Sequence, residues 1–341
     1  MTSPSEPRIS FVIAVRDDAR RLERCLGSIA SGVADGPAAE IIVADNGSID
    51  DSPVVARRAG ARVLELPGLT VAELRNRGAA AASSDALAFV DADHEITRTW
   101  IRDGLDALAG DRVGAAGALY AAPLDGTWVQ RLYGALRGTT IGRCDTHWLG
   151  SGNLIVRREA FEAIGGFDVS LAACEDVDFC RRLRTSGWRL IADERLVSVH
   201  HGDPATLSAL FRAERWRGRD NLRVSLRRPV TLGDLPSAVI PVAELLLALT
   251  AIVGLAASPF IALAWLVAAA CGAAVAGLVG LRAARLFRRL RRLRRPAAID
   301  LARSFLVAGT YDAARAIALV TRAPHHGRGA AGPAAARTPA A

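Results

Sequence analysis

The sequence predicts an α/β domain built on a doubly wound sheet, followed by two apolar helices long enough to cross a membrane. Through about the first 110 residues, short apolar runs rich in β-branched residues alternate with segments of helical periodicity, which is typical of a sheet covered by helices on both faces. Residues 235–281 then contain two apolar stretches separated by a proline. At 341 residues, the chain is long enough for one α/β domain of about 200–250 residues and a further part.

The predicted strands of this domain are short apolar runs. Ile9–Val15 is continuously apolar and rich in β-branched residues, which is typical of a central parallel strand. The stretch 121–149 is less regular and predicts no defined element. The other predicted strands are 40–44, 62–66, Ala86–Val90, 112–120, 154–156 and 196–199.

Polar residues that can begin helices follow several of these strands. Asp17 and Asp18 can cap a helix predicted over 19–30, whose apolar residues fall on one face. Ser48 is suited to cap the next helix, and Thr70 with Glu73 three residues later has the pattern of a capping box.

Acidic residues lie where a parallel sheet binds its ligands, beyond the carboxyl ends of strands. Asp17, Asp45 and the D-A-D pair Asp91 and Asp93 all occupy such positions and should meet in one crevice. If the chain stays extended, Asp91 and Asp93 point to the same side, because side chains alternate with period two. Two carboxylates there suit a divalent cation that also binds phosphates. Taken alone, D-x-D is also compatible with an acidic loop, and the acidic run 175–178 with helix capping.

Five segments in a fixed order carry a more specific signal. They are FVIAVRDD, EIIVADNGSIDDS, ELRNRGAAAASSDALAFVDAD, SGNLIVRREAFEAIGGFD and EDVDFCRRLRTSGWRL. In these segments, which span about residues 9–221, the chain resembles the family 2 glycosyltransferases of the membrane-anchored bacterial type. The resemblance implies the GT-A fold, a doubly wound mixed sheet that binds nucleotide-diphosphate sugars.

The resemblance also implies roles for individual residues in binding the donor. Asp45 would accept the N3–H of a uracil-type base, and Asp93 would bind Mg²⁺ or Mn²⁺ bridging the diphosphate. Asp91 would contact the ribose or the metal with its water, and His200 or His201 matches a histidine that some members add to the metal site. The other donor-binding residues would be Val15 and Asp17 beside the base, Arg75 and Asn76 in the nucleotide pocket, and Gly152 and Asn153 facing the donor sugar.

A second carboxylate pair would act on the acceptor. By the resemblance, Asp176 would be the base that removes the proton of the acceptor hydroxyl, with Glu175 alongside it. An alcohol needs such a base because it is a poor nucleophile, while a metal stabilises the charge on the leaving diphosphate. The family further implies inversion at the anomeric carbon, a UDP-, dTDP- or GDP-sugar as donor, and a hexosyltransferase activity (EC 2.4).

The chain departs from the family pattern at three places. Ala14 stands where the family usually has Pro, and Asp17 where it usually has Asn, which weakens the expected contacts with the base. Processive synthases carry Q-x-x-R-W, whereas this chain has RAERW at 212–216, so a cellulose-type or chitin-type polymerase is not expected. Arg215 and Trp216 either border the acceptor site or lie on lipid headgroups.

The C-terminal third predicts a membrane hairpin. Leu235–Ala257 is apolar apart from Glu244, and 260–281 has no charge, so each can cross a hydrocarbon core of about 30 Å. Arginines on both outer flanks place both ends on the cytoplasmic side. The basic and apolar run 282–295 predicts an interfacial helix on anionic lipid; nucleic-acid binding is not expected directly after a span. A buried helical hairpin in a soluble domain is the alternative to a membrane anchor, and Glu244 either pairs with an arginine or lines a path for a lipid acceptor.

These observations predict four parts and one location. The parts are a catalytic domain over 1–230, two transmembrane helices over 235–282, basic interfacial and amphipathic helices over 283–322, and a disordered tail over 323–341. The N-terminus lacks the apolar core of a signal peptide, and the five cysteines show no C-x-x-C pairing, so we expect the catalytic domain in the cytoplasm.

The sequence thus predicts an inverting transferase at the cytoplasmic face of the inner membrane. The acceptor would be lipid-linked or a cell-envelope glycan, and membrane lipid would be a partner. A non-catalytic membrane scaffold with the same fold is the alternative. A nucleotidyltransferase is not expected, because VIAVRDDARR has no glycine-rich phosphate loop. The sequence does not indicate an oligomeric state.

Overall fold

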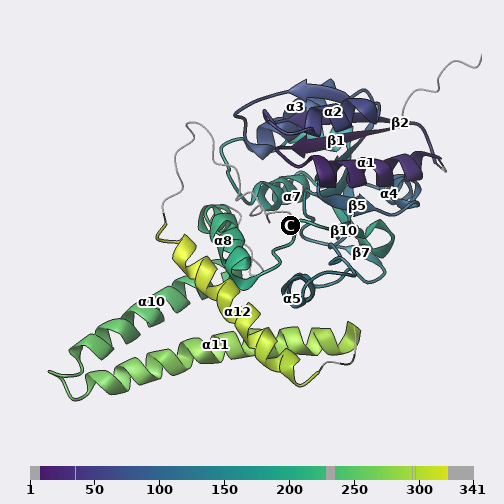
Figure 1. Ribbon diagram of the computed structural model, residues 1–341. Helices are drawn as coiled ribbons and strands as arrows, with labels where there is room; N and C mark the ends of the chain where they lie inside the picture. The colour runs from purple at the N-terminus through teal and green to yellow at the C-terminus, as the bar shows by residue number, and fades with distance from the viewer. Residues whose placement is uncertain (1–7, 35, 228–234, 294, 296, 322–341) are drawn as a thin grey trace, which may run out of the picture. The chain divides into compact units, whose positions relative to one another are not determined.

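The computed structural model describes residues 8–34, 36–227, 235–293, 295 and 297–321, and these form two compact units (Figure 1). The first unit contains the described residues up to 124 together with 137–203. The second contains 125–136 and the described residues after 203. The tail predicted over 323–341 lies outside the described residues.

The first unit is built on an eight-stranded mixed sheet with the order β3-β2-β1-β4-β8-β6-β9-β7. The four strands that come first in the chain are parallel, as the sequence predicts. The antiparallel strands β8 and β7 make the sheet mixed. The strands are β1 (Ile9–Val15), β2 (Ala39–Asp45), β3 (Arg62–Glu65), β4 (Ala86–Val90), β6 (Val113–Gly117), β7 (Arg143–Asp145), β8 (Asn153–Arg157) and β9 (Arg189–Asp193).

Helices cover both faces of this sheet, and a two-stranded sheet stands beside it. The strands β5 (His94–Ile96) and β10 (Ser198–His200) pair antiparallel, so two segments far apart in sequence are joined next to the D-A-D turn. The helices of this unit are α1 (Ala19–Ala34), α2 (Ser52–Arg58), α3 (Val71–Ala81), α4 (Trp100–Leu108), α6 (Arg158–Ala163), α7 (Glu175–Thr185) and the 3₁₀ turn η1 (Glu194–Leu196).

Side chains of each central strand alternate between two cores, one on each face of the sheet. In β1, Phe11 and Ile13 belong to the core beneath α1 and α4, whereas Val12 belongs to the opposite core. Phe11 packs against Trp100 on the first face, with 5.8 Å between ring centroids. Phe89 of β4 lies on the second face. The central strands β1 and β4 are therefore buried on both faces, which explains why their sequences are almost entirely apolar.

Two of the predicted helix starts have different outcomes. The capping box at Thr70 is confirmed: its hydroxyl accepts the N–H of Glu73 over 3.2 Å, and the Glu73 carboxylate accepts the N–H of Thr70 over 2.7 Å. The prediction for Ser48 is wrong, because α2 begins only at Ser52 and Ser48 instead accepts the N–H of Asp17 over 2.9 Å. The stretch 121–149, predicted as irregular, contains a helix and β7.

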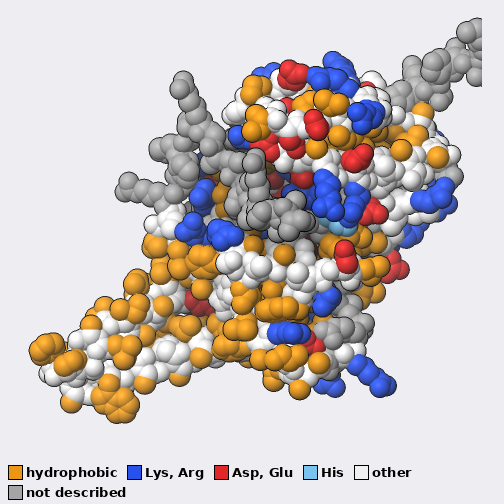
Figure 2. All heavy atoms as spheres, viewed as in Figure 1, with side chains coloured by type: hydrophobic (Ala, Val, Ile, Leu, Met, Phe, Trp, Pro, Cys, Tyr) orange, Lys and Arg blue, Asp and Glu red, His pale blue; other side chains and the backbone are white. Residues whose placement is uncertain are grey.

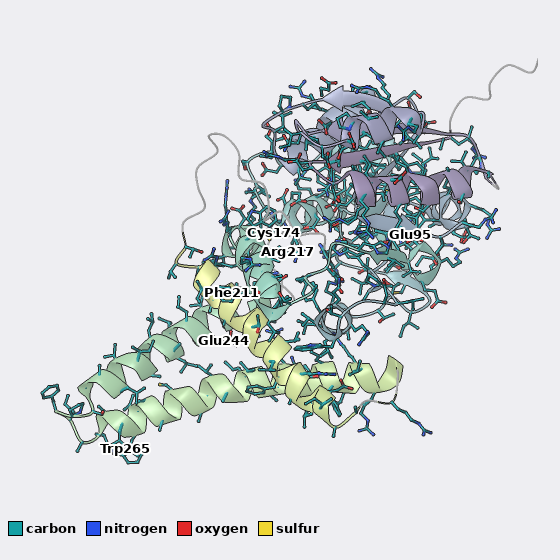
Figure 3. All side chains as sticks on the ribbon, viewed as in Figure 1. Glu95, Cys174, Phe211, Arg217, Glu244 and Trp265 are labelled. Carbon is teal, nitrogen blue, oxygen red and sulfur yellow. The ribbon has the colours of Figure 1, made fainter. Side chains whose placement is uncertain are left out.

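The second unit is helical. Its elements are α5 (Trp128–Arg137, of which Arg137 belongs to the first unit), α8 (Leu207–Arg217), α9 (Asn221–Ser225), α10 (Leu235–Ala257), α11 (Ala264–Leu293) and α12 (Ile299–Ala318). Two of these helices, over Pro236–Ala257 and Ala264–Arg291, are long and apolar enough to cross a membrane by length and composition. They pack as a hairpin, with Trp265 near the turn (Figure 3). Hydrophobic side chains cover this hairpin in Figure 2.

The arginine-rich run after the second apolar stretch does not form a separate helix. Helix α11 continues from its apolar first half through Arg282 to Leu293 without a break. Arg282 pairs with the buried carboxylate of Asp312 in α12 over 2.6 Å, and Glu244 of α10 is also buried. Another buried carboxylate, Glu214, accepts from Arg315 over 2.9 Å. Paired charges inside this unit are costly to break, because a lone buried charge has no water to stabilise it.

Candidate active site

The D-A-D segment follows β4 as a turn and not as an extended strand. The N–H of His94 donates to the carbonyl of Asp91 over 3.0 Å, and β5 begins at His94. The alternation expected of an extended chain therefore does not apply here. Asp93 lies beside two imidazoles, whereas Asp91 is bound by Arg75.

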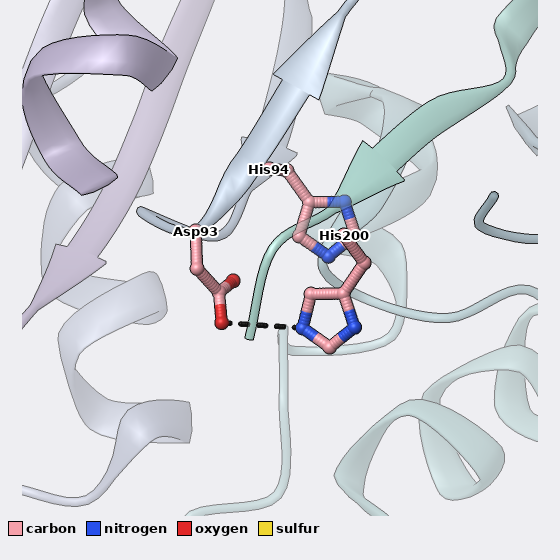
Figure 4. Close-up of side chains that lie close together, drawn as sticks. All are labelled: Asp93, His94 and His200. Carbon is pink, nitrogen blue, oxygen red and sulfur yellow. Dashed lines mark hydrogen bonds and ion pairs between the residues drawn. The ribbon is translucent and has the colours of Figure 1, made fainter. Parts of the chain in front are cut away.

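Asp93, His94 and His200 form a cluster whose ligating atoms lie within 4.8 Å of one another (Figure 4). His94 and His200 face each other across the β5–β10 pair, with 4.5 Å between ring centroids. Asp91, which the resemblance places at the metal, is not in this group, and His94 is in it instead.

His200 lies between two carboxylates in this cluster. His200 Nδ1 lies 2.6 Å from a carboxylate oxygen of Asp203, and His200 Nε2 lies 3.2 Å from a carboxylate oxygen of Asp93. Burial lowers the pKa of His200, but the Asp93 and Asp203 carboxylates outweigh it and raise that pKa to about 9. Burial likewise raises the pKa of Asp93, but the His200 imidazolium holds it well below its usual range. At neutral pH a proton on Nε2 satisfies this contact, and a divalent metal that displaced the proton would find an imidazole lone pair and a carboxylate oxygen at the same position.

His94 is a residue that the sequence did not single out. It is buried, its Nδ1 lies 2.8 Å from the Ser198 hydroxyl, and its ring packs edge-on against Tyr120. Burial and the positive charge of His200 lower the pKa of His94 to about 4. Its imidazole is therefore neutral at pH 7 and can offer a lone pair to a metal.

The neighbouring His201 is directed elsewhere. Its Nε2 lies 2.8 Å from a carboxylate oxygen of Glu95, and its Nδ1 lies 2.9 Å from the Arg24 guanidinium. Of the two histidines that the sequence left open, the geometry favours His200 as the metal ligand.

Arg75 joins the D-A-D turn to the start of α7. Its guanidinium, 3% exposed, donates to Asp91 over 2.6 Å and to Glu175 over 2.7 Å. Glu175 also accepts the Ser151 hydroxyl over 3.2 Å. A Cβ at position 152 would lie 2.5 Å from an oxygen of Asp91, so the close approach of this carboxylate requires glycine there. Arg75 and Glu175 therefore hold the site together.

Asp176 is the second residue of the same helix. Burial raises its pKa to about 7, with a further contribution from the negative charge of Glu175. One of its oxygens accepts the N–H of Val177 over 2.8 Å. A carboxylate with a pKa near neutrality can take up a proton at physiological pH, as a general base must.

The ends of β1 and β2 form a second polar region. Asp45 is buried, and its Oδ2 accepts the N–H groups of Gly47 and Ser48 over 3.1 and 3.0 Å. Its Oδ1 is buried and has no hydrogen-bond partner in the described structure. Val15 pairs with Asp45 in the sheet, and Asp17 adopts a φ of 50° while its carboxylate accepts the Ile49 N–H. An unsatisfied buried acceptor is costly, so Asp45 is suited to receive a donor from a ligand.

Two asparagines expected to face the donor have their side chains committed to the protein. The Asn76 amide is bonded to the backbone of Phe167 in both directions, each over 2.9 Å, and so holds the turn after α6. The fully buried Asn153 accepts the indole N–H of Trp100 and donates to the carbonyls of Ala118 and Leu196. These amides therefore stabilise the fold around the site, and their contact with the donor stays a prediction.

Comparison with known sequences decides the family. The sequence model described as "Glycosyl transferase family 2" matches residues 10–165. The succinoglycan biosynthesis protein ExoA of Rhizobium meliloti is 30% identical over 227 residues, which are 60% of this chain and 67% of that protein. The chain belongs to glycosyltransferase family 2. Another similar protein is the glycosyltransferase AglE of Haloferax volcanii, 26% identical over 66% of this chain and 79% of that protein.

A solved structure shows the same fold. This glycosyltransferase superposes on mannosyltransferase PcManGT from Pyrobaculum calidifontis, in complex with GDP-Man and Mn²⁺, with a TM-score of 0.63 and 20% identity. The match covers 92% of this chain and 86% of that chain. This chain therefore has a mixed GT-A sheet followed by two long apolar helices, as the sequence predicts. The protein is a nucleotide-sugar-dependent glycosyltransferase.

Two residues of this glycosyltransferase were missed by sequence reasoning. His94 directly follows the D-A-D motif, but an extended chain would have turned it away from Asp93. Asp203 stands three residues after His200 and has no motif of its own. Pairing of β5 with β10, which no local pattern shows, brings both to the cluster.

Proposed function

We propose that this protein is an inverting glycosyltransferase that moves a sugar from a nucleotide diphosphate to a hydroxyl acceptor at the cytoplasmic face of the inner membrane. The observation that carries the proposal is Asp176, a carboxylate with a pKa of about 7 at the start of α7. It lies beside Glu175, which Arg75 ties to Asp91 of the D-A-D turn.

Asp176 acts as the base in this proposal. It accepts the proton of the acceptor hydroxyl as the bond to the anomeric carbon forms. Burial and the charge of Glu175 raise the pKa of Asp176, and Arg75, which pairs with Glu175, offsets part of that rise. Glu175 and Asp91 are both bound by Arg75, which supports Asp176 as the base of a direct displacement, and hence inversion.

The metal would be held by Asp93 and His200, with His94 beside them. A carboxylate and imidazoles suit Mn²⁺ and accept Mg²⁺ less well, since Mg²⁺ prefers oxygen ligands; His200 would release its proton on binding the metal. When bound, the metal supplies charge neutralisation for the diphosphate leaving group. Other residues of the chain orient the side chains of the site: Asp203 is hydrogen-bonded to His200, and Arg75 donates to Asp91.

The base of the donor would bind at the ends of β1 and β2. The buried Oδ1 of Asp45 requires an N–H donor, which uracil and thymine supply from N3 and guanine from N1. UDP-, dTDP- and GDP-sugars therefore all remain candidates. Val15 and Asp17 would lie beside the base, and Gly152 near the donor sugar, as the resemblance implies.

The helical unit supports a membrane location. We propose that 235–282 forms two spans, that the basic part of α11 with α12 lies at the interface, and that a catalytic domain over 1–230 stays on the cytoplasmic side. The flanking arginines favour this orientation. A lipid-linked or cell-envelope acceptor follows from the location, and the name of ExoA, a succinoglycan biosynthesis protein, points to the same class of glycan. Membership of an enzyme family sets aside the non-catalytic scaffold.

The test uses the full-length protein in detergent with a panel of UDP-, dTDP- and GDP-sugars. We expect Mn²⁺-dependent release of one nucleoside diphosphate, lowered at least about 100-fold by Asp176→Asn and by Asp93→Ala. Asp106→Asn is the control, because Asp106 is an exposed carboxylate that pairs with Arg195. Anomeric configuration of the product, read by NMR, tests inversion. Near-normal turnover of either site variant would contradict the assigned roles.

A further inference from the structure

A buried carboxylate lies directly behind His200. The side chain of Asp203 is 0% exposed, and its Oδ1 lies 2.6 Å from His200 Nδ1. Arg137 at the end of α5 binds both oxygens of Asp203, one of them over 2.7 Å. The Arg137 guanidinium also lies over the ring of Tyr120, at 5.3 Å from its centroid.

This arrangement fixes which nitrogen of His200 is free. A carboxylate only accepts hydrogen bonds, so the short contact requires the proton on Nδ1. In the neutral form of the ring, which is the form that binds a metal, Nε2 then carries the lone pair, and it is the atom that faces Asp93 at 3.2 Å. If Asp203 did not hold Nδ1–H, the ring could take the other tautomer or rotate, and Nε2 would no longer be an acceptor beside Asp93.

Arg137 makes the buried carboxylate tolerable. A carboxylate without a partner would be costly at a site this deep, and it would draw a second proton towards His200. With the guanidinium bound to both of its oxygens, Asp203 stays ionised and its own position is fixed. Arg137 comes from α5, His200 from β10 and Asp203 from the loop after β10, so the tertiary fold brings the three side chains together.

We propose that Asp203, held by Arg137, is a positioning residue that sets the tautomer and orientation of His200 for metal binding. The proposal rests on the metal site proposed above. A carboxylate behind a metal-binding histidine also makes the imidazole a better ligand, and loss of such a partner typically lowers metal affinity about 10–100-fold.

The experiment measures Mn²⁺ affinity directly, by electron paramagnetic resonance of free Mn²⁺ titrated into the full-length protein without donor. We expect Asp203→Ala to raise the Kd for Mn²⁺ about 10–100-fold, and Asp203→Asn to raise it less, because an amide oxygen can still accept Nδ1–H. Asp193→Ala is the matched control. Asp193 is also a buried carboxylate bound by an arginine, Arg195, but it does not contact the histidines. Its variant should leave the Kd within about twofold, since the metal cluster is untouched.

Kinetics supply a second readout that a purely structural role would not move. The Mn²⁺ concentration giving half-maximal transfer should rise in Asp203→Asn, while kcat at saturating Mn²⁺ stays within about threefold of wild type, since the base is unaffected. If Asp203→Ala does not fold, Asp203→Asn and Arg137→Met carry the test. Unchanged Mn²⁺ affinity in folded variants overturns the positioning role. Wild-type protein that binds no Mn²⁺ overturns the proposed metal site as well, so the two failures are distinguishable.

Discussion

Replacing Asp176 with Asn should abolish transfer and yet make the folded protein more stable above neutral pH. The pKa of Asp176 is about 7 in the folded protein, against an ordinary value of 3.8. Between these values the folded protein keeps a proton on Asp176 that the unfolded chain has released. Wild-type stability therefore falls as pH rises through this window, whereas Asp176→Asn carries no such loss.

The size of the effect follows from the shift. A rise of about 3 pKa units corresponds to at most about 4 kcal/mol, reached above pH 8 and absent below pH 4. The pKa already contains the interaction of the carboxylate with the start of α7, so this is the whole gain expected of Asp176→Asn. It would raise the melting temperature by at most about 8–16 °C in a unit of this size.

The assay compares thermal unfolding of the two proteins at pH 5 and pH 8.5. We expect Asp176→Asn to be more stable by about 1.6 kcal/mol at pH 5, which is about 1.2 pH units above the ordinary pKa, and by at most about 4 kcal/mol at pH 8.5. Asp178→Asn is the control on the same helix turn, because Asp178 is buried and pairs with Arg181 and Arg182. That variant should lose at least about 1 kcal/mol at pH 8.5, since both arginines lose a charged hydrogen-bond acceptor. An Asp176→Asn protein less stable than wild type at pH 8.5 would refute the reasoning.

Other consequences can be tested separately. Because Asp176 must be ionised to act as a base, kcat/KM should fall about tenfold per pH unit below about pH 7, and a flat profile down to pH 5 would exclude it as the base. A Cβ at Gly152 would lie 2.5 Å from an oxygen of Asp91, so Gly152→Ala should lower kcat/KM at least about tenfold with little change in melting temperature, because it displaces the D-A-D turn. A Cβ at Gly78 would lie 2.3 Å from Val12, so Gly78→Ala should cost about 1–3 kcal/mol in denaturant unfolding, and Val12→Ala should recover part of it. Mn²⁺ at 100 times its Kd should stabilise the protein by about 2.7 kcal/mol in the same assay, and a chelator should remove that gain.

Much of the first unit, which contains the candidate active site and is the catalytic unit of the proposed function, could be predicted from local sequence. The apolar runs that form β1 and β4 are buried on both faces, so their composition alone indicates central strands. The same prediction places the acidic residues that follow these strands close together, because the carboxyl ends of parallel strands lie at one edge of the sheet. The capping box at Thr70 is equally local, since all of its atoms lie within four residues.

What could not be predicted depends on contacts between distant segments. Nothing in the apolar pattern of β8 distinguishes an antiparallel strand from a parallel one. In the sequence, Asn153 is expected to face the donor sugar. In the structure, its amide is hydrogen-bonded to the indole of Trp100 and to two backbone carbonyls. The D-A-D segment turns where an extended chain was expected, which separates Asp91 from Asp93 and brings in His94.

The excursion of the chain through α5 has a practical consequence for producing a soluble catalytic domain. In the helical unit, Leu132 and Tyr133 of α5 pack in one core with Leu210, Leu286 and Val307. The chain enters this unit before the catalytic unit is complete, so no single cut separates the two. A protein shortened to end at Asp203 would keep Asp93 and His200 but expose the apolar face of α5 to water. Its solubility would have to be restored by replacing that face with polar residues, and not by moving the cut.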